Sequence, residues 1–288
     1  LPESAASSLP APALAPTAVQ ASDGDVILAN PWDEGFVSFA QNGSNLNQQD
    51  SVSDAWNSFG FGLREMVVVT VGNNEFLITA AQGQTRDGWS VDETGITSYA
   101  IGSGASVAQD TIGAGDGLGL MVPTDMTTVS AGGQTYVVMT SAQSNSGALS
   151  VLEVTANGSL GLVDHVGDTR DTRFGAAQAV AALEVDGRAY VVAGGGDDGL
   201  SLFTLMPGGR LVLLHSIADS AQTGLNGITT IELAASGNDL HIFVASQSDA
   251  GVSHLTVDLS DVGQTVSTGN GGGTTSGGGQ DDVIAGQD

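Results

Sequence analysis

The sequence predicts an all-β protein built from a repeated unit, and three observations support this fold class. The 288 residues include 42 glycines and only 5% aromatic residues, which is typical of many short strands joined by tight turns. No long stretch shows the apolar period of an amphipathic helix. A hairpin pattern returns along the chain, and residues 189–211, AYVVAGGGDDGLSLFTLMPGGRL, are its clearest copy.

This copy consists of two expected strands and two turns. Residues 190–193 form a short apolar run suited to a buried strand, and residues 194–199 form an acidic glycine turn. Residues 200–205 read as a second strand, and residues 207–209, Pro-Gly-Gly, turn the chain again. A hairpin cannot bury both of its faces alone, so we expect it to stack against copies of itself.

The first strand of the hairpin recurs five times. Its starts are Val26, Phe76, Tyr136, Tyr190 and Ile242, at spacings of 50, 60, 54 and 52 residues. A further strand and a two-residue turn such as Asp186-Gly187 precede each hairpin, and a fourth strand such as LGLVDHVGD follows it. Four antiparallel strands in about 50 residues are typical of one blade of a β-propeller.

The predicted propeller therefore has about five four-stranded antiparallel blades and spans residues 13–264. The expected blades are 13–54, 62–114, 119–168, 175–219 and 227–264. Five blades can close a small ring, or they can be part of a larger propeller, and the sequence leaves both open. We interpret residues 1–12, rich in Pro, Ala and Ser, as a linker, and residues 265–276 as a flexible Gly/Thr/Ser linker.

The charge balance is strongly acidic. The chain has 32 Asp and Glu residues against six arginines and no lysine, which gives a formal net charge of -26. Nucleic acid is a poor partner for such a surface, because phosphates need cations. Calcium suits it, although acidity by itself also keeps a protein soluble. The chain has no cysteine, and no apolar run approaches the ~20 residues of a membrane helix.

The end of the chain differs from the repeats. Residues 277–285, GGGQDDVIA, resemble the nine-residue repeat of the RTX (hemolysin-type) calcium-binding proteins, Gly-Gly-x-Gly-x-Asp-x-apolar-x. Asp282 and Ile284 match the pattern, Gln280 departs from it, and residues 286–288 begin a second copy. The resemblance implies calcium held by Asp281, Asp282 and Asp288 once further repeats stack, and a secreted or cell-surface, extracellular protein. Residues 277–288, alone, are expected to be disordered.

A second resemblance concerns the blades. Runs such as YVVAGG, followed by DGLSLFTL and GGRL, resemble those of lactonase-type propellers related to phosphogluconolactonase. This resemblance supports the propeller fold more than it supports an activity.

One end of the predicted blades gathers acidic turns and links. The set comprises Asp33, Glu34, Asp54, Asp87, Asp168, Asp197, Asp198, Asp219 and Asp249. One interpretation is a calcium-mediated surface for glycans or a surface protein, with Trp32 and Trp89 stacking on a sugar. The other is structural, because Asp caps turns through its own side chain and would then recur in every blade.

Support for catalysis is weak. The histidines, His165, His215, His241 and His254, show no H-x-x-x-H pairing, and the chain has no G-x-S-x-G motif. A lactonase-like metal site would use inward-facing carboxylates such as Glu65 and Asp125. Together with what the RTX resemblance implies, this predicts a non-catalytic, extracellular, calcium-associated binding or adhesion module of a secreted RTX-type protein. The alternatives are a lactonase-like metal-dependent hydrolase and a structural spacer or assembly subunit.

Overall fold

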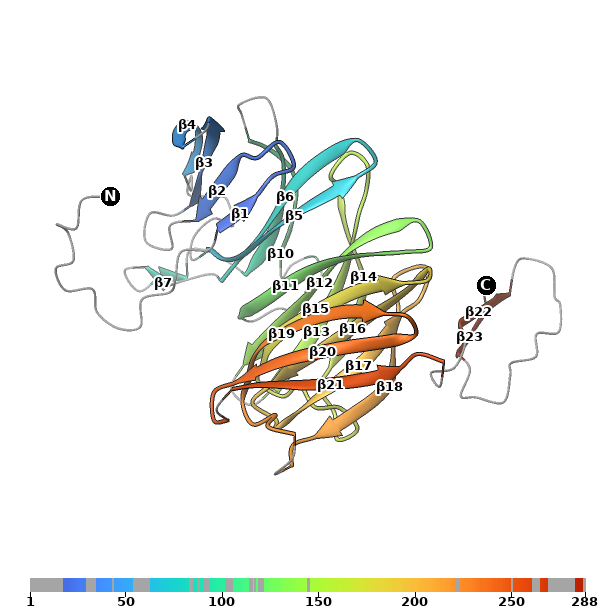
Figure 1. Ribbon diagram of the computed structural model, residues 1–288. Helices are drawn as coiled ribbons and strands as arrows, with labels where there is room; N and C mark the ends of the chain where they lie inside the picture. Colours follow the sequence, from blue (N-terminus) through green and yellow to red (C-terminus); the bar gives the residue numbers. More distant parts are fainter. Residues whose placement is uncertain are drawn as a thin grey trace.

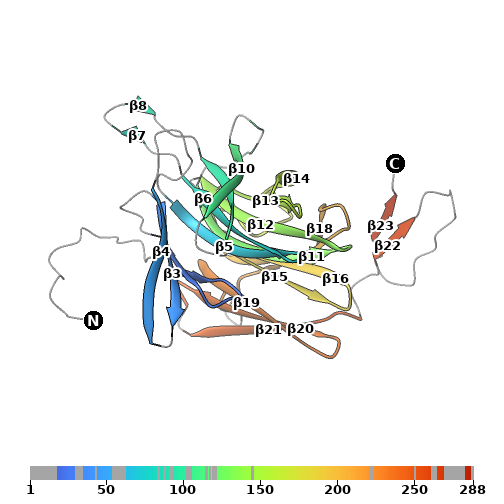
Figure 2. The same cartoon turned by 90° about the horizontal axis from the view of Figure 1, so that it is seen from above.

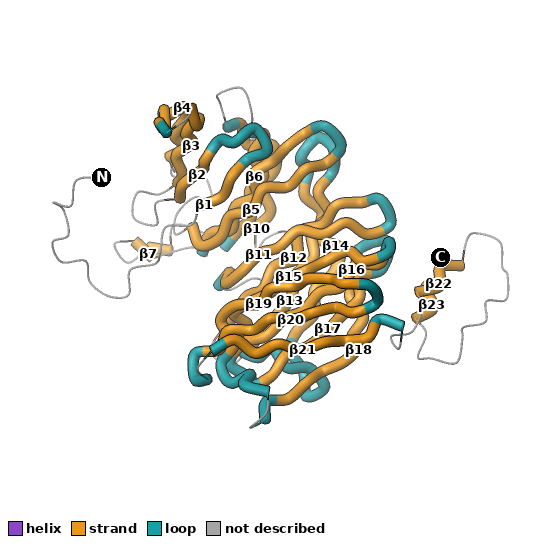
Figure 3. The backbone as a smooth tube through the Cα atoms, in the orientation of Figure 1, coloured by secondary structure: helices purple, strands orange, loops and turns teal. Residues whose placement is uncertain are grey.

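The structure is a computed structural model whose described residues form mainly β-strands (Figure 1). It describes residues 18–29, 35–42, 44–53, 63–82, 85–86, 89–90, 94–101, 106–113, 116, 118, 122–143, 146–220, 223–249, 251–260, 265–268 and 283–286. These residues contain no α-helix, and short loops join the strands (Figure 3). Among them there is consequently no helix long and apolar enough to cross a membrane.

The strands form five successive antiparallel sheets. The first contains β1 (Ala18–Gln20), β2 (Val26–Ala29), β3 (Gly35–Asn42) and β4 (Asn45–Ser53). The second contains β5 (Leu63–Val71), β6 (Asn74–Ala81), β9 (Gly95–Ala100) and β10 (Val107–Gly113). The third contains β11 (Pro123–Ala131), β12 (Gln134–Gln143), β13 (Ser146–Val154) and β14 (Leu160–Gly167).

The fourth sheet contains β15 (Ala177–Val185), β16 (Arg188–Gly195), β17 (Gly199–Leu205) and β18 (Leu211–Ala218). The fifth has three described strands, β19 (Ile228–Ser236), β20 (Asp239–Ser246) and β21 (Val252–Asp258). Two short pairs lie outside these sheets: β7 (Thr85–Arg86) with β8 (Trp89–Ser90), and β22 (Thr265–Thr268) with β23 (Val283–Gly286), which run parallel.

This architecture is a β-propeller of five blades, and the predicted fold class is confirmed. Each described strand of a blade pairs antiparallel with its neighbour, and the sheets follow one another in chain order from the first (blue) to the fifth (orange) (Figure 2). The innermost strands β1, β5, β11, β15 and β19 pack side by side in that order. No strands of the first and fifth sheets pack to a comparable extent among the described residues.

Two-residue turns join the first two strands of the second to fifth blades, whereas residues 21–25 form a longer connection in the first. Asp186 and Gly187 connect β15 to β16 with φ values of 51° and 79°. This left-handed backbone is accessible to Gly and, among other residues, mainly to Asn and Asp, so the Asp-Gly sequence determines the hairpin.

The core lies between successive sheets. The third and fourth sheets share a cluster that includes Tyr136, Val191 and Phe203, and the rings of Phe174 and Phe203 meet edge to face at 5.8 Å. Every residue of β17 is buried, because sheets cover both of its faces. The fifth sheet is buried on one face only: Ile242 and Val244 are buried, whereas Phe243 between them is 37% exposed.

A recurring aspartate links the outer strands of neighbouring blades. Asp50, Asp110 and Asp164 each follow a bulge in β4, β10 and β14, and each accepts the N–H of the next residue through Oδ1. Through Oδ2 they accept the backbone N–H groups of Ser106, Leu160 and Leu211 in the following blade, at 2.6, 2.8 and 2.7 Å. His215 occupies this position in β18.

Candidate functional site

The inner strands begin with a shared irregularity. The pairing of β5, β11, β15 and β19 with the next strand shifts after the first residue of each, which is a β-bulge. Glu65 and Asp125 hold the same position beside this bulge in the second and third blades, where the fourth and fifth have Ala179 and Thr230. Because β5 packs against β11, the two carboxylates lie on adjacent strands.

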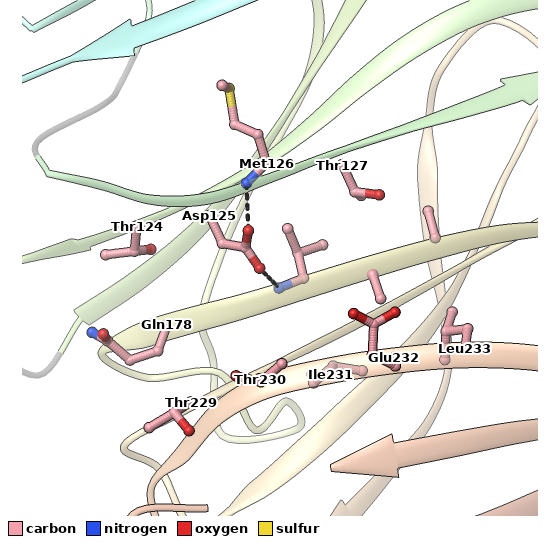
Figure 4. A pocket seen from close by; sticks show the side chains of 13 residues that line it. Thr124, Asp125, Met126, Thr127, Gln178, Thr229, Thr230, Ile231, Glu232 and Leu233 are labelled. Atoms are coloured by element: carbon pink, nitrogen blue, oxygen red, sulfur yellow. Dashed lines mark hydrogen bonds between the residues drawn. The ribbon is translucent and has the colours of Figure 1, made fainter. Parts of the chain in front are cut away.

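Asp125 is held by two backbone groups (Figure 4). Its Oδ1 accepts the N–H of Met126 at 2.9 Å, and its Oδ2 accepts the N–H of Val180 in β15 at 2.8 Å. The carboxylate therefore fixes its own bulge and joins the third blade to the fourth. This role requires an acceptor with two oxygens, which Asp supplies.

The two carboxylates have raised pKa values. The pKa of Glu65 is raised to about 8, mainly by burial and in part by the Asp125 carboxylate, while Arg64 opposes both. The pKa of Asp125 is raised to about 6, mainly by burial and slightly by Glu232, while the N–H groups of Val180 and Met126 lower it. At pH 7 Glu65 is mainly protonated and Asp125 is mainly ionised, so an acid and a base lie on adjacent strands.

A groove of about 390 Å³ lies beside Asp125, between β11, β15 and β19. Most of its lining side chains carry a hydroxyl, amide or carboxylate group, and Glu232 stands on the neighbouring strand β19 (Figure 4). These polar residues are Thr124, Asp125, Thr127, Gln178, Thr229, Thr230 and Glu232. Carboxylates accept hydrogen bonds and hydroxyls both donate and accept, so the groove suits a ligand rich in hydroxyl groups or one that carries a cation.

Some of the predicted acidic loop residues use their carboxylates for hydrogen bonds within the fold. Asp168 accepts the Thr172 hydroxyl at 2.8 Å and the Phe174 N–H at 3.2 Å through Oδ1. Asp219 repeats the arrangement one blade later with the Thr223 hydroxyl at 3.2 Å and the Leu225 N–H at 2.7 Å. Both aspartates thus cap the link between blades, as the structural interpretation expects.

Asp249 also binds backbone, because its Oδ2 accepts the Asn226 N–H at 2.9 Å. Asp197 forms an ion pair of 3.8 Å with Arg173 and also accepts a backbone hydrogen bond from Gly175. Burial raises the pKa of Asp197, and the nearby carboxylates of Asp168 and Asp198 add to this, while Arg173 lowers it.

The Asp198 carbonyl accepts the Asp219 N–H at 2.8 Å, so the turn of the fourth blade and the link after it are joined. The structure therefore brings Asp197 and Asp198 together with Asp168 and Asp219 at one end of the fourth blade.

Other predicted residues lie outside the described part of the chain. These are Trp32, Asp33, Glu34, Asp54, Asp87, Asp281, Asp282 and Asp288. Trp89 belongs to β8, where only the backbone is described. In the residues that the structure does describe, no group of three or more His, Asp or Glu side chains could hold a metal ion.

The sequence prediction missed two features. Asp50, Asp110 and Asp164 were visible as the last residues of the similar segments LNQQD, SVAQD (residues 106–110) and LGLVD. Glu232 left no signal, because the other blades have no acid at its position. Only the packing of β19 against β15 places it at the groove.

No family model matches the chain, and no curated protein matches it. Solved structures that resemble it include a GH32 beta-fructofuranosidase of Bombyx mori, with a TM-score of 0.44 and 10% identity over 80% of this chain. This chain spans only 54% of that protein. An Aleuria aurantia lectin mutant in complex with alpha-methyl-L-fucoside has a TM-score of 0.48 and 15% identity, covering 85% of this chain and 77% of the lectin.

A third similar structure is a putative 6-phosphogluconolactonase from Bacteroides uniformis. Its TM-score is 0.47 and its identity 13%, covering 82% of this chain and 64% of that protein. What these three proteins bind or convert is a property of those proteins, because a shared fold does not imply a shared function.

Proposed function

We propose that this propeller is a non-catalytic binding or adhesion module of a secreted RTX-type protein, and that it binds carbohydrate in the groove beside Asp125. The observation that carries the proposal is the lining of that groove, where threonine hydroxyls and an amide surround the two carboxylates Asp125 and Glu232. Sugar hydroxyls donate to carboxylates and exchange hydrogen bonds with threonines, so the chemistry is complementary.

Three aspartates of the loop face are used by the fold, so the proposed ligand sites lie elsewhere. Asp168, Asp219 and Asp249 each accept a backbone N–H group, so their carboxylates serve the fold. The calcium that we propose is therefore assigned to the RTX-like residues 277–288 and the repeats that would stack on them.

The carbohydrate proposal is tested on a glycan array with the full chain and with Thr230→Val, which removes a hydroxyl from the groove. We expect a restricted set of glycans to bind the natural chain and to bind the variant more weakly. Loss of the signal upon Glu184→Gln, on an exposed part of β15 away from the groove lining, would contradict the assignment of the site.

The calcium proposal is tested separately by titration of a chain ending at Thr265, a chain ending at Asp288 and a chain extended by further natural repeats. Calcium uptake with ordering of the end is expected only in the extended chain. Equal uptake by all three would show that the calcium belongs to the blades instead.

A lactonase-like hydrolase is the second candidate, and one observation favours it. Glu65 and Asp125 have raised and different pKa values on adjacent strands, which suits a general acid and a general base. The test is lactone hydrolysis with added divalent metals by the natural chain and by Asp125→Asn. Turnover that Asp125→Asn abolishes would establish the hydrolase and displace the non-catalytic proposal.

A further inference from the structure

Two histidines meet on the open face of the fifth sheet. His241 in β20 and His254 in β21 are diagonal neighbours, because His241 pairs with Thr256 and Phe243 pairs with His254. His241 Nδ1 lies 3.0 Å from His254 Nε2, and the ring centroids are 5.1 Å apart. The His241 side chain is half-buried and that of His254 is exposed, so both are accessible from solvent.

The pair departs from the repeat. The hairpin pairing makes His241 equivalent to Tyr190 and His254 equivalent to Leu202 in the fourth blade. Tyr190 and Leu202 are 3% and 2% exposed and pack against the fifth sheet. The need to cover a neighbouring blade therefore explains apolar side chains at these positions, and it does not explain two imidazoles.

The surrounding side chains hold the pair in place. The ring of Phe243 stacks on that of His254 with centroids 4.6 Å apart and planes 7° from parallel. The Thr256 hydroxyl lies 3.4 Å from His241 Nδ1 on the other side of the pair. The stacking limits the positions that the His254 ring can take.

The separation of the two nitrogens matches the bite of a metal ion. Two metal–nitrogen bonds of about 2.0–2.1 Å place their nitrogens about 2.9 Å apart at a right angle and about 3.3 Å apart in a tetrahedron. The observed 3.0 Å falls within this range. The two nitrogens now share a hydrogen bond, which a bound metal ion would replace once the donor imidazole changes tautomer.

We propose that His241 Nδ1 and His254 Nε2 bind one divalent transition-metal ion on the outer face of the fifth sheet. Imidazole nitrogens suit copper, nickel and zinc, and the general order of affinity places Cu²⁺ first. Calcium and magnesium prefer oxygen ligands, so this site is separate from the calcium proposed at residues 277–288. Water completes the coordination, since no third His, Asp or Glu joins the pair among the described residues.

The test is titration of the full chain with Cu²⁺ and with Ni²⁺ in the presence of excess calcium, which occupies the carboxylates of this acidic chain. We expect one site per chain, and His241→Ala or His254→Ala is expected to weaken it by about tenfold or more, because one ligand then remains. The double variant should bind little more weakly than either single variant. His165→Ala and His215→Ala are matched controls and should bind as the natural chain does.

Electron paramagnetic resonance of bound Cu²⁺ gives a second readout on the natural chain. The expected spectrum shows coupling to two imidazole nitrogens, and to one in either single variant. Binding would fall in acid, since protonated imidazole is not a ligand. The proposal is overturned if the natural chain and His254→Ala bind Cu²⁺ equally, or if the control substitutions weaken binding to the same extent.

Discussion

The Asp125 carboxylate crosses the boundary between two blades, where its Oδ2 accepts the Val180 N–H at 2.8 Å. Its Oδ1 accepts the N–H of Met126 on its own strand. Asp164 repeats this two-part contact at the rim, with the N–H groups of His165 in its own strand and Leu211 in the next blade. Aspartates therefore join these blades at both the inner and the outer strand.

Asp125→Ala should destabilise the protein by about 1–3 kcal/mol, because two backbone N–H groups lose their acceptor. Urea denaturation measures the loss. Glu184→Ala, at an exposed position of β15, is the matched control and should change the free energy of unfolding by less than about 0.5 kcal/mol. Equal stability of Asp125→Ala and the natural chain would contradict the linking role.

Glu65 should make the protein less stable as the pH rises. The folded chain binds this proton more tightly than the unfolded chain, because the pKa rises from 4.5 to about 8 on folding. The contribution is fully present below pH 4.5 and is lost as the pH rises to about 8. Asp125 acts in the same direction between 3.8 and about 6.

Glu65→Gln isolates the effect of Glu65. Relative to the natural chain it should gain on the order of 3 kcal/mol in free energy of unfolding between pH 5 and pH 8. Denaturation at both pH values measures this difference. An unchanged or reversed difference would show that Glu65 is not held protonated by its burial.

Asp164→Ala should cost about 1–3 kcal/mol, since the N–H of Leu211 in the fourth blade loses its acceptor. Asp171→Ala removes an equal charge from an exposed position in the following link and serves as the control. Hydrogen exchange adds a local readout, in which the Leu211 amide should exchange faster in Asp164→Ala only. Equal exchange in both variants would argue against the link.

Gly147→Ala should disrupt the third blade. A Cβ at Gly147 would lie 1.9 Å from the Phe174 carbonyl oxygen, so the backbone must move. Gly161→Ala meets no atom within 4 Å and should be neutral or slightly stabilising. Thermal unfolding compares the two variants, and a melting temperature for Gly147→Ala at or above that of Gly161→Ala would contradict the packing.

The sequence repeat was sufficient to predict most of the fold. Five hairpin starts and their turns, such as Asp186-Gly187, indicated the order of strands that the structure has, because turn chemistry and alternation are local properties. The predicted fifth start was one residue late, since the pairing makes His241, and not Ile242, equivalent to Tyr190. The local sequence pattern of one blade does not predict its contacts with the next blade. The role of Asp50, Asp110 and Asp164 depends on an N–H group about 50 residues away.

The site was predictable only in part, for the same reason. Repeat alignment placed Glu65 and Asp125 on inner strands, but their pKa values depend on burial by neighbouring strands. For Asp168 and Asp219 the sequence allowed a ligand or a cap, and only the hydrogen bonds to Phe174 and Leu225 show the cap. His241 and His254 match no short metal-binding motif, because they lie on different strands and are 13 residues apart.

We propose that the propeller binds carbohydrate in the groove beside Asp125 without converting it. Isothermal titration of a glycan selected on the array against the natural chain, Asp125→Asn and Glu184→Gln tests it most directly. We predict saturable binding with intact glycan recovered afterwards, at least tenfold weaker binding by Asp125→Asn, and unchanged binding by Glu184→Gln. Equal affinity of the natural chain and Asp125→Asn, or recovery of a cleaved glycan, would contradict it.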